Sequence, residues 1–94
     1  MNTPRTESEI LAAIDELFDK LWYNRHLILR YRIKFGVETV SPEIWKLALK
    51  AARKIEKRYG KNNLAWNDFE WGVINGKLSA LRWVLGDDWD MLDT

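Results

Sequence analysis

The chain has 94 residues with six tryptophans and no cysteine, and its stability requires no disulfide or metal because each aromatic side chain can bury about 150–250 Å². No apolar run approaches the roughly 18 residues of a membrane span, and the start MNTPRTESE is polar, so we expect a soluble cytoplasmic protein. The net charge of +1 favours no class of partner, but residues 37–61 hold seven basic and three acidic groups, whereas residues 62–94 hold two and six.

The first predicted element is a helix over residues 7–35. Thr6 and Glu9 have the spacing of a capping box, and Gly36 supplies the stop. Its main apolar stripe recurs every four and three residues, which is typical of a coiled-coil-like packing face. The stripe consists of Ile10, Ile14, Leu17, Leu21, Asn24, Ile28, Tyr31 and Phe35. We expect the other helices to cover this stripe along its whole length.

A second apolar stripe occupies only the C-terminal half of this helix and points away from the first. It consists of Trp22, His26, Leu29 and Ile33. Two shorter helices would not cover both faces, so we predict that this stripe is the interface of a homodimer with antiparallel copies of the helix. Protonation of His26 in the interface would then weaken the dimer. The alternative is a monomer in which Trp89, Met91 and Leu92 fold back over the stripe.

The second predicted element is a helix over residues 42–59. Ser41 is the expected N-cap, Pro42 occupies the first helical position, and Gly60 ends the helix. One face carries a line of cations, which Arg25, Arg30 and Lys34 of the first helix could extend: Lys46, Lys50, Arg53 and Lys57. Their spacing suits a phosphate backbone, so weak, sequence-tolerant nucleic-acid binding is an alternative function. Against it stand the absence of a known binding motif and the frequency of solvated lysine-rich faces.

The third predicted element lies in the stretch from Trp66 to Trp89. Asn75-Gly76 between apolar runs is typical of a β-hairpin. Three- and four-residue spacing of the apolar residues, and a second half rich in leucine and alanine, instead predict a helix over residues 68–85. Asn67 offers the N-cap and Gly86 the stop.

Two glycines inside this helix cost about 1 kcal/mol each relative to alanine. The spacing of Gly72, Gly76 and Ala80 predicts a helix-packing groove in which another backbone approaches closely. Inside a soluble bundle, such close packing would offset the cost of the glycines.

No pattern of reactive residues is present. His26 is the single histidine, and no nucleophile is arranged with it. The acidic tail 87–94 carries Asp87, Asp88, Asp90 and Asp93, which lack the spacing of a calcium loop. We therefore predict no catalytic, metal-binding or cofactor-binding residue and no cofactor.

Two segments carry a resemblance to known proteins. Trp71 to Asp90, which reads WGVINGKLSALRWVLGDDWD, and Leu21 to His26, which reads LWYNRH, resemble a group of small bacterial proteins without an assigned activity, ligand or site. The resemblance implies a bacterial intracellular protein and implies nothing about mechanism.

The sequence thus predicts a single all-α domain of three helices, bundle-like, with one long N-terminal helix. We expect a small interaction or regulatory protein that is not an enzyme and acts as a homo-oligomer. Its expected partners are a second copy of itself or another protein, and no membrane.

Overall fold

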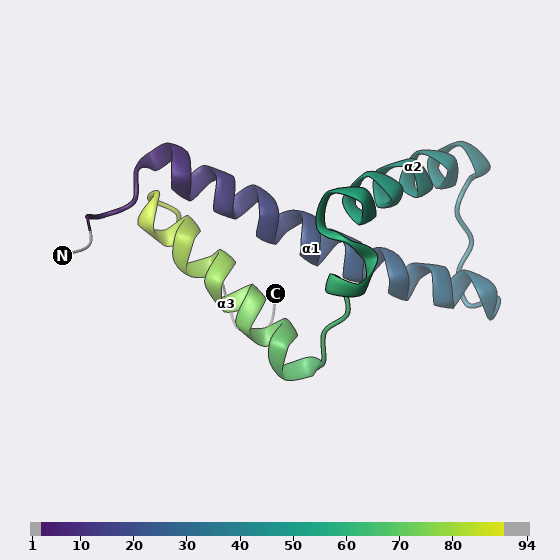
Figure 1. Ribbon diagram of the computed structural model, residues 1–94. Coiled ribbons are helices and arrows are strands. Elements are labelled where there is room, and N and C mark those ends of the chain that lie inside the picture. The colour runs from purple at the N-terminus through teal and green to yellow at the C-terminus, as the bar shows by residue number, and fades with distance from the viewer. Residues whose placement is uncertain (1–2, 90–94) are drawn as a thin grey trace. The chain divides into compact units, whose positions relative to one another are not determined.

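The computed structural model describes residues 3–89, and each regular element in this part of the chain is a helix (Figure 1). The elements are α1 (Glu7–Lys34), α2 (Pro42–Tyr59), the short 3₁₀ helix η1 (Lys61–Asn63) and α3 (Asp68–Val84). The prediction of an all-α protein with three helices and a long N-terminal helix is confirmed. None of the described helices combines the length and apolarity needed to cross a membrane.

Local side-chain caps explain where the helices begin. At α3, Asn67 Oδ1 accepts a hydrogen bond from the Glu70 amide at 2.8 Å, and Glu70 Oε1 accepts one from the Asn67 amide at 3.1 Å. Thr6 and Glu9 form the same reciprocal box before α1. Helix α3 continues through Asn75, whose side-chain amide donates to the Trp71 carbonyl at 2.9 Å. The choice of a helix over a hairpin is therefore confirmed.

The chain forms two compact units, and α1 contributes to both. Among the described residues, unit 1 contains residues 3–18 and 66–89, and unit 2 contains residues 19–65. In unit 1, α3 lies beside the N-terminal part of α1 (Figure 1). Leu17 of α1 and Ile74 and Leu78 of α3 are buried there.

Unit 2 combines the C-terminal part of α1 with α2 and η1 (Figure 1). Its buried residues are Leu21, Tyr23, His26, Ala52, Ile55 and Leu64. Gly60 has a φ of 84°, in the left-handed region that favours glycine, and it turns the chain from α2 into η1. After this turn, Leu64 is only 1% exposed and anchors the end of η1.

None of the six tryptophans belongs to the buried set, although all lie in the described part of the chain. Trp89 stacks on Trp83 of α3 with ring centroids 4.8 Å apart, and both rings remain about half exposed. This contact holds the start of the acidic tail on unit 1. Met91, Leu92, Asp90 and Asp93 lie outside the described residues, so the predictions for them stay open.

Candidate functional site

Unit 2 holds a stack of three rings in which His26 lies between Trp22 and Trp45. The centroid of the His26 ring is 5.1 Å from that of Trp22 and 5.2 Å from that of Trp45. Trp22 and His26 belong to α1 and Trp45 to the first turn of α2, so the stack joins these helices. His26 is 4% exposed, and its Nε2 atom has no hydrogen-bond partner among the described atoms. Burial lowers the pKa of this imidazole.

The second apolar stripe is therefore covered in large part by its own chain. Trp22, Leu29 and Ile33 are half-buried, and His26 is buried. The expectation that this stripe would remain open is wrong in unit 2, because α2 packs on this face of α1 through Trp45. His26 is consequently not an exposed interface residue. Homodimerisation itself stays a prediction.

The main stripe of α1 is exposed where α2 leaves it uncovered. Ile28, Tyr31 and Phe35 are 49%, 65% and 60% exposed, and the rings of Tyr31 and Phe35 lie 4.6 Å apart. In unit 1, by contrast, Leu17 of the same stripe is buried. The prediction that the other helices cover the main stripe along its whole length is thus wrong in unit 2. We call Ile28, Tyr31 and Phe35 the exposed α1 stripe.

Gly72 and Gly76 also lie on an exposed surface. Apart from the backbone of α3 itself, no described atom lies within 4 Å of a Cβ built on either glycine. The predicted close approach of another segment of the chain is therefore absent among the described residues. The neighbouring Phe69 and Val73 are also exposed, and we call these four residues the glycine face of α3.

Ala80, the third residue of the predicted groove, is part of a different feature of unit 1. It lies in a groove of about 390 Å³ between α1 and α3. The groove is lined by Ala13, Glu16, Leu17, Lys77, Ala80 and Leu81. The three small residues of the sequence pattern are thus not brought together in one packing groove.

The predicted line of cations on α2 is exposed along its length. Lys46, Lys50, Arg53 and Lys57 are all exposed, and none has an ion-pair partner among the described residues. Unit 2 holds twelve basic and four acidic side chains, whereas residues 3–18 and 66–89 of unit 1 hold three and eight. The two units therefore carry opposite net charges.

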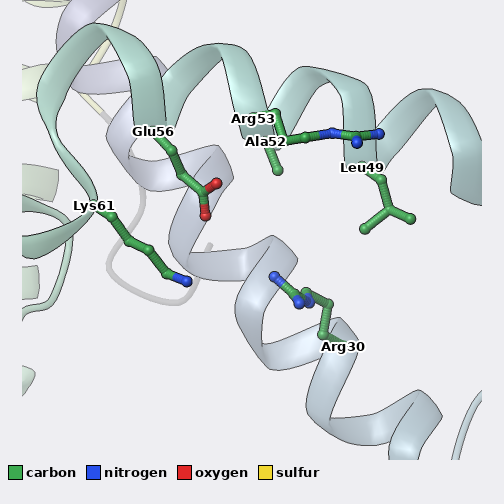
Figure 2. A pocket seen from close by; sticks show the side chains of 6 residues that line it. All are labelled: Arg30, Leu49, Ala52, Arg53, Glu56 and Lys61. Atoms are coloured by element: carbon green, nitrogen blue, oxygen red, sulfur yellow. The ribbon is translucent and has the colours of Figure 1, made fainter.

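A cleft of about 230 Å³ lies beside this line, between α1, α2 and η1 in unit 2 (Figure 2). Its lining residues are Arg30, Leu49, Ala52, Arg53, Glu56 and Lys61. In Figure 2, the side chains of Arg30 and Lys61 extend into the space beside the Glu56 carboxylate, from α1 and from the start of η1. The turn at Gly60 places Lys61 at this cleft.

A hydrogen bond from a buried tyrosine holds the Glu56 carboxylate in place. Tyr23, which is 1% exposed, donates its hydroxyl hydrogen bond to Glu56 Oε2. Burial and this hydrogen bond raise the pKa of Tyr23 to about 12. The hydroxyl therefore keeps its proton at neutral pH and remains a donor to the carboxylate.

The cations of the cleft differ from two other arginines of unit 2. Arg58 pairs with Asp19 and Arg32 pairs with Glu38, each at 3.2 Å. Arg30, Arg53 and Lys61 have no such partner within the described chain. These three cations and the Glu56 carboxylate thus line a cleft that is open to solvent, with Arg30 and Lys61 nearest the carboxylate and Arg53 on the side of Leu49 (Figure 2).

Three residues of this arrangement were not singled out from the sequence: Tyr23, Glu56 and Lys61. The available signal is that Glu56 is the single acid of α2 after Glu43, and that it follows directly on the buried Ile55. An acid at that position in a basic helix lies near the helix contact, where its charge needs a partner.

Within residues 3–89, no group of three His, Cys, Asp or Glu side chains is arranged to hold a metal ion. Comparisons of the chain with protein-family models, curated proteins and solved structures find no match. The resemblance to small bacterial proteins therefore stays a prediction, and function is inferred from the exposed surfaces.

Proposed function

We propose that this protein is a small, non-enzymatic interaction protein that works as a homodimer. The observation that carries this proposal is the exposed α1 stripe, where Ile28, Tyr31 and Phe35 leave a connected apolar surface in contact with water. Fully burying such side chains contributes about 1.5–3 kcal/mol each, and monomeric proteins rarely keep large connected patches of this kind.

A second copy of the chain is the partner that suits this stripe best. The stripe lies in the basic unit 2, flanked by Arg25 and Lys34, whereas the acidic unit 1 exposes the glycine face of α3. Bulky side chains of one copy would enter a surface without side chains at Gly72 and Gly76 of the other. Opposite charges would surround the contact, and two-fold symmetry would form it twice.

Light scattering and sedimentation tests can establish this assembly. At tens of micromolar protein we expect a dimer that weakens as salt is raised, because part of the attraction is between exposed charges. Tyr31→Glu should weaken dimerisation by at least about tenfold, since a buried carboxylate without a partner costs more than 1.4 kcal/mol.

Leu47→Glu is the matched control for the dimer. Leu47 is 68% exposed on α2 and lies outside the exposed α1 stripe, so this change should leave the dimer intact. A monomeric wild type at tens of micromolar would rule out the proposed function. A dimer that tolerates Tyr31→Glu would place the interface elsewhere.

The exposed cations of α2 support a second candidate function, namely weak binding of nucleic acid. Lys46, Lys50, Arg53 and Lys57 follow one side of the helix without ion-pair partners in the described chain. They offer charge to phosphates and no side-chain amide to read a base edge, so binding would tolerate any sequence.

This candidate predicts a steep dependence on salt. With four phosphate contacts, affinity for a short DNA duplex should fall about 100-fold between about 50 and about 200 mM salt. Lys50→Glu combined with Arg53→Glu should abolish binding, while Lys77→Glu, on unit 1, should leave it unchanged. Fluorescence anisotropy measures all three. Binding that persists at high salt, or in the double variant, would exclude α2 as the site.

A further inference from the structure

The cleft of unit 2 is a separate feature that the homodimer does not require. Arg30 comes from α1, Arg53 from α2 and Lys61 from η1, so three different elements bring positive charge to one space. Leu49 and Ala52 form the apolar part of its lining. Arg30 and Lys61 extend into this space beside Glu56, while the Arg53 side chain extends along α2 beside Leu49 (Figure 2). Cations from separate elements that line one cleft, with no ion-pair partner in the described chain, are suited to receive an anion.

Glu56 neutralises only part of the positive charge that these three cations bring to the cleft. One of its oxygens accepts the hydroxyl hydrogen bond of the buried Tyr23. The carboxylate is thereby held at the cleft wall, and no ion pair joins it to Arg30, Arg53 or Lys61. The cleft therefore keeps a net positive charge of two from its three cations and single carboxylate.

We propose that this cleft binds a single phosphate group, either inorganic phosphate or the phosphoryl end of a small organic molecule. A phosphate dianion matches the net charge of the cleft, and guanidinium and ammonium groups are its usual donors in proteins. The cleft volume of about 230 Å³ is below the range of about 300–1,000 Å³ typical of sites for drug-sized ligands. One phosphate with a small apolar extension over Leu49 therefore fits the space.

Binding can be measured by titration at constant ionic strength, followed by the amide chemical shifts of unit 2. The probes are inorganic phosphate, ribose 5-phosphate and acetate. We expect saturable millimolar or tighter binding of a phosphate probe and weaker binding of acetate. Tighter binding of ribose 5-phosphate identifies an organic ligand, and equal binding of the two identifies the free ion. No phosphate binding at millimolar concentration, or acetate bound as tightly, overturns the proposal.

Two substitutions of opposite effect locate the ligand. Lys61→Gln should weaken phosphate binding at least about tenfold, because it removes a charge-assisted hydrogen bond. Glu56→Gln should strengthen binding about fivefold, because it removes a repelling charge yet keeps an acceptor for Tyr23. A merely structural role of Glu56 would predict a loss of binding in the second variant, and that loss would overturn the proposal.

Lys46→Gln and Lys50→Gln are the matched controls. Both residues lie on α2 and outside the cleft. Each change should alter phosphate affinity by less than about twofold, because salt screens the attraction between the phosphate and an exposed charge outside the cleft. Equal effects of these controls and of Lys61→Gln would also overturn the assignment. Circular dichroism of each variant separates lost binding from lost folding. The oligomeric state does not enter these outcomes, so the dimer and the phosphate site stand or fall separately.

Discussion

Replacing Leu64 with alanine should lower the free energy of unfolding by about 2–5 kcal/mol. Leu64 is 1% exposed, and its amide donates to the Lys61 carbonyl at 3.3 Å, so the side chain anchors η1 in unit 2. Truncation removes buried methyl groups and leaves a cavity. The free energy of unfolding of a native protein is only about 5–15 kcal/mol, so this change would remove a large part of the total stability.

Urea denaturation followed by circular dichroism measures this loss. Leu47→Ala is the matched control, since the same atoms are removed from a side chain that is 68% exposed. The control should change the free energy of unfolding by no more than about 0.5 kcal/mol. An equal cost at both positions would contradict the assignment of Leu64 to the core.

Replacing both Gly72 and Gly76 with alanine should raise the free energy of unfolding of the monomer by about 2 kcal/mol. Alanine is favoured over glycine inside a helix by about 1 kcal/mol, and each added methyl group meets open space. The same methyl groups would obstruct the partner stripe in the proposed homodimer. The double variant should therefore form a more stable monomer and a weaker dimer.

These opposite effects require two measurements. Thermal unfolding at a concentration that keeps the protein monomeric reports stability, and sedimentation at tens of micromolar reports dimerisation. Gly60→Ala is the control, because a φ of 84° and the Asn63 amide 3.1 Å from a built Cβ make alanine unfavourable there. A loss of stability in the double variant would mean that the glycine face is covered in the folded monomer.

The helices could be predicted from sequence because their ends are fixed by neighbouring residues. Ser41 accepts from the Ile44 amide as the N-cap of α2, and Asn67 and Glu70 close the start of α3. Each of these contacts spans three residues. Capping signals therefore located the elements to within one residue, while the three- and four-residue spacing of apolar residues decided between helix and hairpin at Asn75.

Which face of α1 each helix covers could not be predicted in this way. Periodicity identifies two apolar stripes on α1 but does not select the one on which α2 packs. That selection depends on the fit of Trp45 against His26, nineteen positions earlier in the chain. The pair of Tyr23 and Glu56 is separated by 33 positions. The exposed α1 stripe and the cleft both follow from these distant contacts.

Because His26 is buried in the aromatic stack, its imidazole binds a proton less readily in the folded protein than in the unfolded chain. Burial lowers the pKa of His26 most, Arg30 lowers it further, and Glu56 opposes them. Below the ordinary value of 6.5, the unfolded imidazole is charged while the folded one still resists protonation. The stability that this residue contributes is complete above pH 6.5 and is lost as the pH falls through the lower folded value. We therefore expect mild acid to reduce the stability of unit 2 through the single imidazole of the chain.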